Sequence, residues 1–554
     1  MQGLGGAQIA TDATPGLVGE RRDACGPLRI GHPGRLAHAR HPVTGRTVVT
    51  PHPGRPMRPG PRRRTALAET RSMSAQDALW LTMDRPNNLM VIDAVMILRG
   101  RPAWDDVIAV VRERVVNRFP VFACRAMQGD GGWVWQQDPH FDIYRHLRRV
   151  ELPAPADVEQ LEEYVAQQRS RPIDRDRPLW DVTLVDSVRL TDGTEGSALV
   201  ARFHHAIADG VRMTQVMLSL CDTDDPGVSA MVGRARGEHG VWSVATGVAG
   251  AAAEAVVDSA RAIAKATASV LREGTTALES GLEVGLQLVR QPGRLIDAFE
   301  SLGIDNRLAN TTGSVAKLAL RGTSVRTVWS GTPGMRKAVA WSPPLSLPEV
   351  KAIGRRHDAS VNDVLLTAVG GGLRRYLHAH GDESVPEVEW MVPVNLVPIA
   401  ENLPEDLGNY FALVMAVLPL EPADPIARLH ATRARMDRIK NSDEPVLTFG
   451  IQRGISAAPR QVSIALTDFF ANKAVGVLTN VPGPRSTMTF AGTEVSQVVG
   501  FAPCSGDQPM TATIFSYADT ITIGYAVDAD LVPDARELVA GTVDELRRLT
   551  EETA

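Results

Sequence analysis

An apolar run that ends in two adjacent histidines constrains this chain more than any other feature. Ala198 to Phe203 predicts a buried strand, His204-His205 follow it directly, and Asp209-Gly210 come after three further residues. Val211 to Leu220 then predicts a helix. The two imidazoles therefore lie where a strand turns sharply into a helix.

This arrangement suits the abstraction of a proton from a hydroxyl group. An imidazole has an ordinary pKa of about 6.5, so it accepts a proton near neutral pH and then returns it. Neighbouring residues of a strand point to opposite faces, so only one of His204 and His205 faces a given cleft while the other packs elsewhere. We expect Asp209 to hold the following loop and Gly210 to supply backbone freedom at the helix entry.

The alternative is a histidine pair satisfied in the core and followed by an ordinary turn. A single histidine would favour that alternative. Histidine is scarce here, with 13 in 554 residues, and the joint pattern of two histidines and a spaced Asp-Gly pair favours a functional site.

Several stretches resemble known families. His204, His205, Asp209 and Gly210 match the HHxxxDG motif of the chloramphenicol-acetyltransferase-like acyltransferases, which include peptide-synthetase condensation domains. Other stretches resemble the bacterial wax ester synthase/diacylglycerol acyltransferase family. In chain order, and over residues 73 to about 545, these are Ser74–Ala78, Asp142–Leu147, Arg177–Trp180, Val361–Leu365, Leu407–Asn409, Thr479–Pro484 and Asp530–Asp534.

The resemblance implies an α/β fold of two chloramphenicol-acetyltransferase-like halves, with mixed sheets and flanking helices, joined by a helical linker. The active site would lie in a tunnel between the halves. It implies an acyl-CoA-dependent O-acyltransferase that esterifies diacylglycerol, a long-chain fatty alcohol or both. His205, the second histidine of the motif, would be the general base. Acyl-CoA would be a co-substrate, with no cofactor besides.

Three further groups are candidate substrate-binding residues, each with a plainer structural alternative. Pro178, Leu179 and Trp180 form a rigid apolar corner that lines an acyl channel or packs in the core. Asn362 and Asp363 cap the helix that follows or support the wall of the active site. Asn480 binds substrate or closes a turn.

The pattern of elements divides the chain into four parts. Residues 1–72 form an extension, residues 73–225 one half with the histidine motif, residues 226–334 an Ala-rich amphipathic helical linker, and residues 335–554 the second half. The halves alternate short β-type runs with helical periods, which predicts mixed α/β structure. The linker either contacts a lipid surface or packs as a hairpin; its charges are balanced, which favours packing.

The first 72 residues have an unusual composition, with twelve Arg, no Lys, four acidic residues, nine Pro and eleven Gly. This composition predicts disorder. The segment is either an unfolded extension or a basic arm for an anionic partner, and the absence of interleaved aromatic residues argues against nucleic acid. Neither a secretory signal nor a run long enough to span a membrane is present, so we expect a cytoplasmic protein, with peripheral contact to the inner membrane surface or lipid bodies as an option.

Other chemistries lack support in the sequence. No nucleophile elbow, phosphate-binding loop, dinucleotide fingerprint or zinc-protease motif is present. His378 and His380 lie on different faces of a helix, and the four cysteines are widely spaced, so we expect no metal site and no disulfide framework.

Two departures from the family pattern bear on the acceptor. Asn395–Val397 replaces a Ser and an Arg after a strand, and Gly331–Gly334 replaces an Asn-Gly-rich opening. Two other functions therefore stay open: acylation of a soluble or carrier-bound acceptor, as condensation-type relatives perform, and lipid binding without catalysis.

Overall fold

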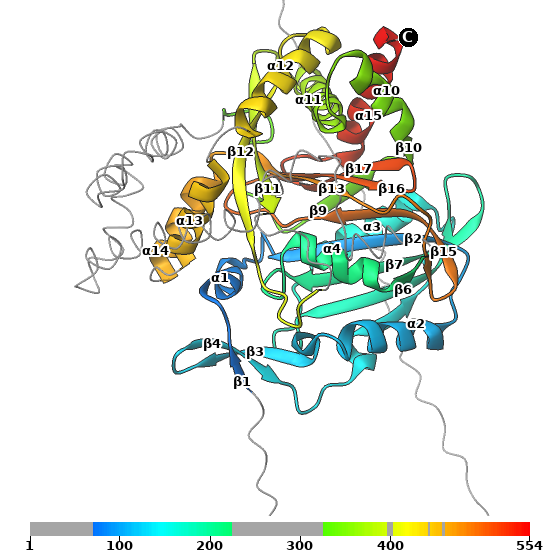
Figure 1. Ribbon diagram of the computed structural model, residues 1–554, viewed down its shortest axis with the longest axis vertical. Helices are drawn as coiled ribbons and strands as arrows, with labels where there is room; N and C mark the ends of the chain where they lie inside the picture. The colour runs from blue at the N-terminus through cyan, green and yellow to red at the C-terminus, as the bar shows by residue number, and fades with distance from the viewer. Residues whose placement is uncertain (1–69, 224–324, 396–402, 441–443, 457–459, 554) are drawn as a thin grey trace, which may run out of the picture. The chain divides into compact units, whose positions relative to one another are not determined.

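Two seven-stranded sheets organise the protein, for which a computed structural model describes residues 70–223, 325–395, 403–440, 444–456 and 460–553 (Figure 1). The mixed α/β architecture that the sequence predicts is confirmed. Most of residues 226–334, the expected linker, lie outside the described residues, as do residues 1–69.

The first sheet carries the histidine motif at the end of one of its central strands. Its order is β5-β6-β7-β2-β15-β14-β8. The strands are β5 (Leu147–Val150), β6 (Trp180–Arg189), β7 (Glu195–His204), β2 (Val91–Arg99), β15 (Thr493–Phe501), β14 (Thr489–Phe490) and β8 (Cys221–Asp222).

Alternation along the strands gives this sheet two buried faces. On β2, Met96 and Leu98 pack with helices α2 (Trp104–Val111) and α4 (Gly210–Ser219). Val95 and Ile97 face the other way, toward α3 (Val158–Arg169). Helix α2 continues into a π-helical turn, η1 (Arg112–Val116). A sheet covered on both sides holds β7, and hence the histidines at its end, in one position.

The second sheet has the order β10-β17-β16-β13-β11-β12, and β9 also pairs with β17. Helices α10, α11, α12 and α15 cover one face, and α14 contributes to the other. Their bounds are β9 (Lys337–Trp341), β10 (Leu345–Ser346), β11 (Glu387–Asn395), β12 (Phe411–Pro419), β13 (Gly476–Pro482), β16 (Met510–Tyr517), β17 (Thr520–Asp528), α10 (Leu347–Arg356), α11 (Val361–Ala379), α12 (Pro425–Lys440), α13 (Glu444–Ser456), α14 (Arg460–Ala471) and α15 (Ala535–Thr553).

One strand exchange departs from the sequence division into two halves. Residues 489–501, which lie in the predicted second half, form β14 and β15 of the first sheet. Strand β15 runs antiparallel to β2, with Val499 opposite Val95. The two halves are therefore interleaved, because the backbone hydrogen bonds of β2 are completed by a distant part of the chain.

The boundary predicted at residue 72 is also corrected. Thr70–Ser72, assigned to the disordered extension, form β1 and pair with Val134–Gln136 of β4 (Gly132–Gln137). Strand β3 (Cys124–Gly129) completes this small sheet. An apolar alternation is missing from these three residues, so the sequence pattern alone does not reveal the strand.

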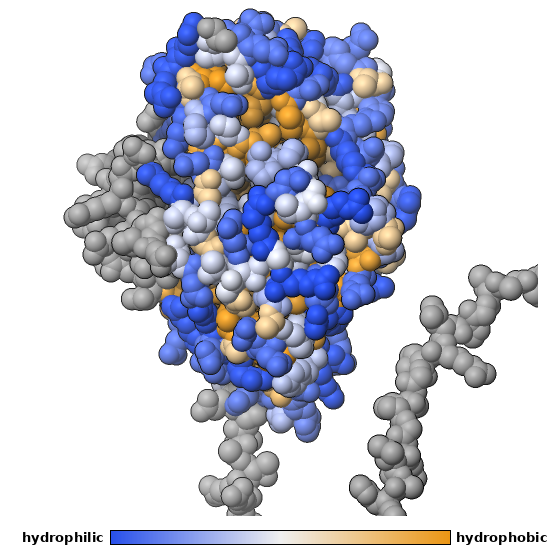
Figure 2. Space-filling view, turned by 90° about the vertical axis from the view of Figure 1, so that its right-hand side faces the viewer, coloured by the Kyte–Doolittle hydropathy of each residue, from blue (hydrophilic) through white to orange (hydrophobic). Residues whose placement is uncertain are grey.

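Hydrophilic residues cover most of the face seen in Figure 2, and hydrophobic residues gather mainly in its upper half, at the level of the second sheet and its helices. Among the residues described, none of the helices combines the length and apolar character needed to cross a bilayer.

Glu162 of α3 links the helix to the edge of the second sheet. Its side chain is 5% exposed; one oxygen accepts from the Trp341 N–H of β9 at 2.9 Å, and the other lies 3.0 Å from a guanidinium nitrogen of Arg536. Burial raises the pKa of Glu162 to about 7, although Trp341 and Arg536 oppose this shift.

This raised pKa predicts a pH-dependent stability. Between about pH 4.5 and pH 7 the folded protein retains a proton on Glu162 that the unfolded chain releases, so the free energy of unfolding falls as the pH rises and levels off above 7. Glu162→Gln should remove up to about 3 kcal/mol of this dependence, measured by urea unfolding from pH 5 to 8. Glu163→Gln, at an exposed neighbour, is the control and should leave the pH dependence intact.

Candidate active site

Strand β7 ends at His204, and the chain then leaves the sheet in a tight turn. The His204 N–H donates to the Leu179 carbonyl at 3.0 Å, and the His205 N–H donates to the Met90 carbonyl at 2.8 Å. The turn closes when the Ile207 N–H donates to the His204 carbonyl at 3.0 Å. Backbone hydrogen bonds to the residues directly before β6 and β2 therefore fix both histidines.

The imidazole of His205 is held on its face and on its edge. The ring of Trp80, from α1 (Ala75–Met83), stacks on it with centroids 3.8 Å apart, and Phe411 of β12 lies 5.7 Å away. Nδ1 of His205 lies 2.9 Å from Oδ1 of Asn409. The residue is 6% exposed, and burial lowers the pKa of His205 to about 3. The ring is therefore neutral at physiological pH.

His204 has different surroundings. It is 1% exposed, and its Nδ1 accepts from the Ala206 N–H at 3.1 Å. Its Nε2 lies 3.7 Å from a carboxylate oxygen of Asp84, which also binds Arg175. Burial lowers the pKa of His204, against the effect of Asp84. His204 thus packs against a partly buried carboxylate, while its neighbour meets the Asn409 amide.

Asp209 holds the loop from both sides. It is the N-cap of α4: one carboxylate oxygen accepts from the Arg212 N–H at 2.9 Å, and the other accepts from the Tyr410 N–H at 2.9 Å. Gly408 forms a parallel bridge with Ala208 and has a φ of 62°, in the left-handed region that favours glycine. Residues 408–410 therefore clamp the loop that follows the histidines.

The expectation for Gly210 is wrong. Gly210 is the first residue of α4, its φ is not in the left-handed region, and a Cβ added there would meet nothing within 4 Å. The bend after the histidines is instead held by hydrogen bonds from Gly408 and Asp209. Backbone freedom is needed at Gly408 of the clamp rather than at Gly210.

The Pro178, Leu179 and Trp180 corner is core in this structure. All three residues are buried, with Leu179 and Trp180 at most 1% exposed. The Trp180 indole N–H donates to the Phe122 carbonyl at 2.8 Å, and its ring stacks on His146. The corner reaches the site through its backbone, because the Leu179 carbonyl accepts from His204.

Asn362, Asp363 and Asn480 come together in the second sheet and its helix layer. Helix α11 begins at Val361 with Ser360 as its N-cap, so the N-cap role expected for Asn362 and Asp363 is wrong. Asp363 is instead the third residue of a capping box, and its carboxylate accepts from the Ser360 N–H. The Asn480 amide donates to the Asn362 side chain at 2.8 Å. The hydrogen bonds of His205 run instead to Met90 and Asn409.

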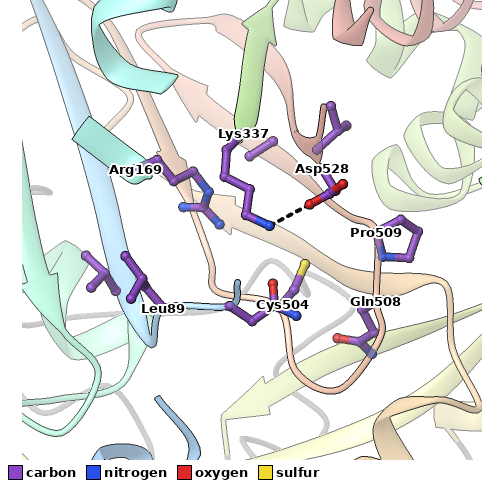
Figure 3. Close-up of a pocket in the computed structure, with 11 residues that line it drawn as sticks. Leu89, Arg169, Lys337, Cys504, Gln508, Pro509 and Asp528 are labelled. Atoms are coloured by element: carbon purple, nitrogen blue, oxygen red, sulfur yellow. Dashed lines mark hydrogen bonds and ion pairs between the residues drawn. The ribbon is translucent and has the colours of Figure 1, made fainter. Parts of the chain in front are cut away.

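A small pocket, partly open to solvent, lies between the residues before β2, the start of β9 and the end of β17 (Figure 3). Leu89, Cys504 and Gln508 line it, and its two cations already have partners. Lys337 pairs with Asp528 at 2.7 Å, and Arg169 pairs with Asp93. Neither histidine of the motif lines this cavity, so a tunnel at His205 stays a prediction.

Four residues around His205 were not assigned roles from the sequence: Asp77, Trp80, Asn409 and Phe411. Asp77 and Asn409 lie in the stretches Ser74–Ala78 and Leu407–Asn409, whose resemblance to the family was the available signal. The described residues contain no cluster of three or more His, Cys, Asp or Glu side chains that could hold a metal ion. His380, at the C-terminal end of α11, contacts Glu537 at 2.9 Å.

Comparison with protein families decides the class of this site. The wax ester synthase/diacylglycerol acyltransferase catalytic domain matches residues 73–365, and the C-terminal domain of the same family matches residues 407–550. The chain belongs to this family. It is therefore an acyltransferase, and the histidine motif lies within the matched catalytic domain.

Known relatives cover most of the chain. A Mycobacterium tuberculosis protein named as a diacylglycerol O-acyltransferase is 27% identical over 454 residues, which is 79% of this chain and 87% of that protein. A second M. tuberculosis protein with this activity in its name is 26% identical over 426 residues, or 75% of this chain and 81% of its own length.

Solved structures confirm the two-lobed, chloramphenicol-acetyltransferase-like fold. A wax ester synthase/diacylglycerol acyltransferase from Marinobacter aquaeolei superposes with a TM-score of 0.58 at 17% identity, covering 87% of this chain and 99% of that one. The first condensation domain of the calcium-dependent antibiotic synthetase gives a TM-score of 0.50 at 13% identity, covering 88% and 97%.

Because Asp209 accepts from two backbone N–H groups, its loss should lower the free energy of unfolding more than the loss of an ordinary helix cap. Asp209→Ala leaves the Arg212 and Tyr410 N–H groups without their acceptor and should lower the free energy of unfolding by about 2–3 kcal/mol. Asp142→Ala removes a cap that binds only the Tyr144 N–H at an exposed site, so about 1 kcal/mol or less is expected. Urea unfolding measures both, and equal losses would contradict the clamp.

Proposed function

We propose that the protein transfers an acyl group from acyl-CoA to the hydroxyl group of diacylglycerol or of a long-chain fatty alcohol, with His205 as the general base. The observation that carries this proposal is the state of the His205 ring. Its Nδ1 faces an amide oxygen at 2.9 Å, which requires a hydrogen on Nδ1 and leaves a lone pair on Nε2.

The proposed reaction balances without a cofactor or metal. Nε2 of His205 takes the hydroxyl proton while the alcohol oxygen forms a bond to the thioester carbonyl carbon. The tetrahedral intermediate then breaks its carbon–sulfur bond, and the departing thiolate takes the proton from Nε2. The products are an ester and free CoA, and the imidazole is neutral again.

Burial of His205 supports this sequence of proton transfers. A ring whose pKa is lowered to about 3 carries its hydrogen on Nδ1 and no second proton at rest, so the lone pair on Nε2 is available across the physiological range. Once protonated, the same ring is a strong acid and gives its proton readily to the thiolate. Stacking on Trp80 fixes the plane of the ring, and exclusion of water limits hydrolysis of the thioester.

The acceptors are lipids, so the proposal includes peripheral contact with a membrane or lipid-droplet surface on the cytoplasmic side, where acyl-CoA and the lipid meet. Lipid contact was the less favoured of the two roles expected for the amphipathic linker, and most of that linker lies outside the described residues. Flotation of the purified protein with diolein-containing vesicles tests this part of the proposal.

The function is tested with labelled palmitoyl-CoA, diolein and hexadecanol. His205→Ala should lower kcat by about 10²–10⁴-fold with either acceptor, because the general base is removed. His380→Ala, at an exposed histidine paired with Glu537, is the matched control and should retain activity. Circular dichroism verifies folding. Full activity in His205→Ala would contradict the role of the base, and no ester with either lipid would contradict the acceptor class.

The lowered pKa also predicts the pH profile. Because His205 ionises near pH 3 rather than 6.5, kcat/KM should show no loss that follows an ordinary histidine titration between pH 8 and pH 6. Initial rates in a constant-ionic-strength buffer series measure this. An inflection near pH 6.5 that occurs in kcat/KM but not in kcat at saturating acyl-CoA would report the His205 ring of the free enzyme, and would contradict its burial there.

A further inference from the structure

We infer that Asn409, oriented by Asp77, is a positioning residue that selects the hydrogen-bonding state of His205 and directs Nε2 to the reactants. This inference rests on the proposed function. It assigns a role to two residues, one from α1 and one from the segment before β12, that lie 332 positions apart in the sequence.

The first step is an account of the Asn409 amide. Its nitrogen lies 2.8 Å from Oδ1 of Asp77 and 3.0 Å from the His205 carbonyl oxygen, so both amide hydrogens have acceptors. Its oxygen lies 2.9 Å from Nδ1 of His205. With the amide reversed, an oxygen would face two oxygens and both would lose their donor. Asp77 therefore determines which end of the amide meets the ring.

The second step passes from the amide to the imidazole. An amide oxygen accepts and cannot donate, so the ring must carry its hydrogen on Nδ1. The neutral ring then has its lone pair on Nε2. The opposite state, with hydrogen on Nε2, would place two acceptors 2.9 Å apart and could not act as a base at Nε2.

The third step concerns the source of this control. Asp77 and Trp80 are one turn apart on α1, on the same face of the helix. Trp80 stacks on the His205 ring, and Asp77 fixes the amide at its edge. Asp77 is itself 8% exposed, and its N–H is bound by the Ser74 hydroxyl at the helix N-terminus. Helix α1 therefore fixes the plane of the His205 ring through Trp80, and the hydrogen-bond partner of its Nδ1 through Asp77.

The charged and titratable groups near His205 are few. Asp77 comes from α1, and His204 is the residue before His205. Asp209 and Arg212 lie at the start of α4. Strand β12 contributes the Phe411 ring and no charged side chain. An uncharged amide is thus the direct partner of the ring, and Asp77 acts through it. A carboxylate in place of that amide would keep the hydrogen on Nδ1 while raising the pKa of the ring.

The test exchanges the two polar groups. Asn409→Ala should lower kcat by about 10²-fold with little change in KM for acyl-CoA, because the ring loses the partner that selects its state. Asn409→Asp alone places two carboxylates together and should be at least as impaired. Asn409→Asp combined with Asp77→Asn restores a donor facing an acceptor between these two residues, although an oxygen still faces the His205 carbonyl. The exchanged pair should therefore recover only part of the activity, at least tenfold over Asn409→Asp.

The exchanged pair also supplies a readout that a purely structural contact would not move. With a carboxylate against Nδ1, the acid limb of kcat should shift upward toward pH 6, whereas in wild type it lies far below. Rates are measured in palmitoyl-CoA and diolein assays from pH 5 to 8, with melting temperatures for every variant.

The outcomes separate this inference from the proposed function. Loss of activity in His205→Ala together with full activity in Asn409→Ala would overturn the inference alone. Retained activity in His205→Ala would overturn the proposed function. If Asn409→Ala does not fold, the exchanged variant decides: a folded enzyme with no recovery and an unshifted acid limb overturns the inference.

Discussion

The clamp between the histidine loop and residues 408–410 is the contact on which the site depends. Gly408 donates to the Ile207 carbonyl, and its own carbonyl accepts from the Asp209 N–H, each at 3.2 Å. Asp209 in turn accepts from Tyr410. These bonds join the end of β7 to the start of β12, so a loop of the first sheet and a strand of the second share one rigid junction. Asn409 lies between Gly408 and Tyr410, and the hydrogen bonds of these two residues hold it beside the His205 ring.

Much of this architecture could be predicted from periodicity. The strand expected over Ala198 to Phe203 lies within β7, and the helix expected over Val211 to Leu220 matches α4 to within one residue at each end. The pairing of β15 with β2 in the first sheet could not be predicted, because strands that lie hundreds of residues apart leave no local pattern in the sequence. The helix α1 was also missed; its short sequence, Ala75–Met83, has weak amphipathic character.

The site shows the same division. The motif located His204, His205 and Asp209 because their spacing is local and chemically unusual. Asn409 and Asp77 are distant from it in sequence, and each is an ordinary polar residue until the fold places a donor opposite an acceptor. Gly210 shows the reverse error: a glycine beside a bend suggested backbone freedom, while the bend is held by hydrogen bonds elsewhere.

An amide partner suits a buried histidine better than a carboxylate when the substrates are apolar. A carboxylate on Nδ1 would strengthen the base, but the resting site would then hold an uncompensated charge, or an ion pair, away from water. Asn409 keeps its pair with His205 neutral. The carboxyl group is one hydrogen bond further from the ring, on Asp77, and burial raises the pKa of Asp77. The ring gives up basicity and gains acidity in its protonated form. For a reaction that ends with proton delivery to a thiolate, a neutral partner therefore favours the second proton transfer at the expense of the first.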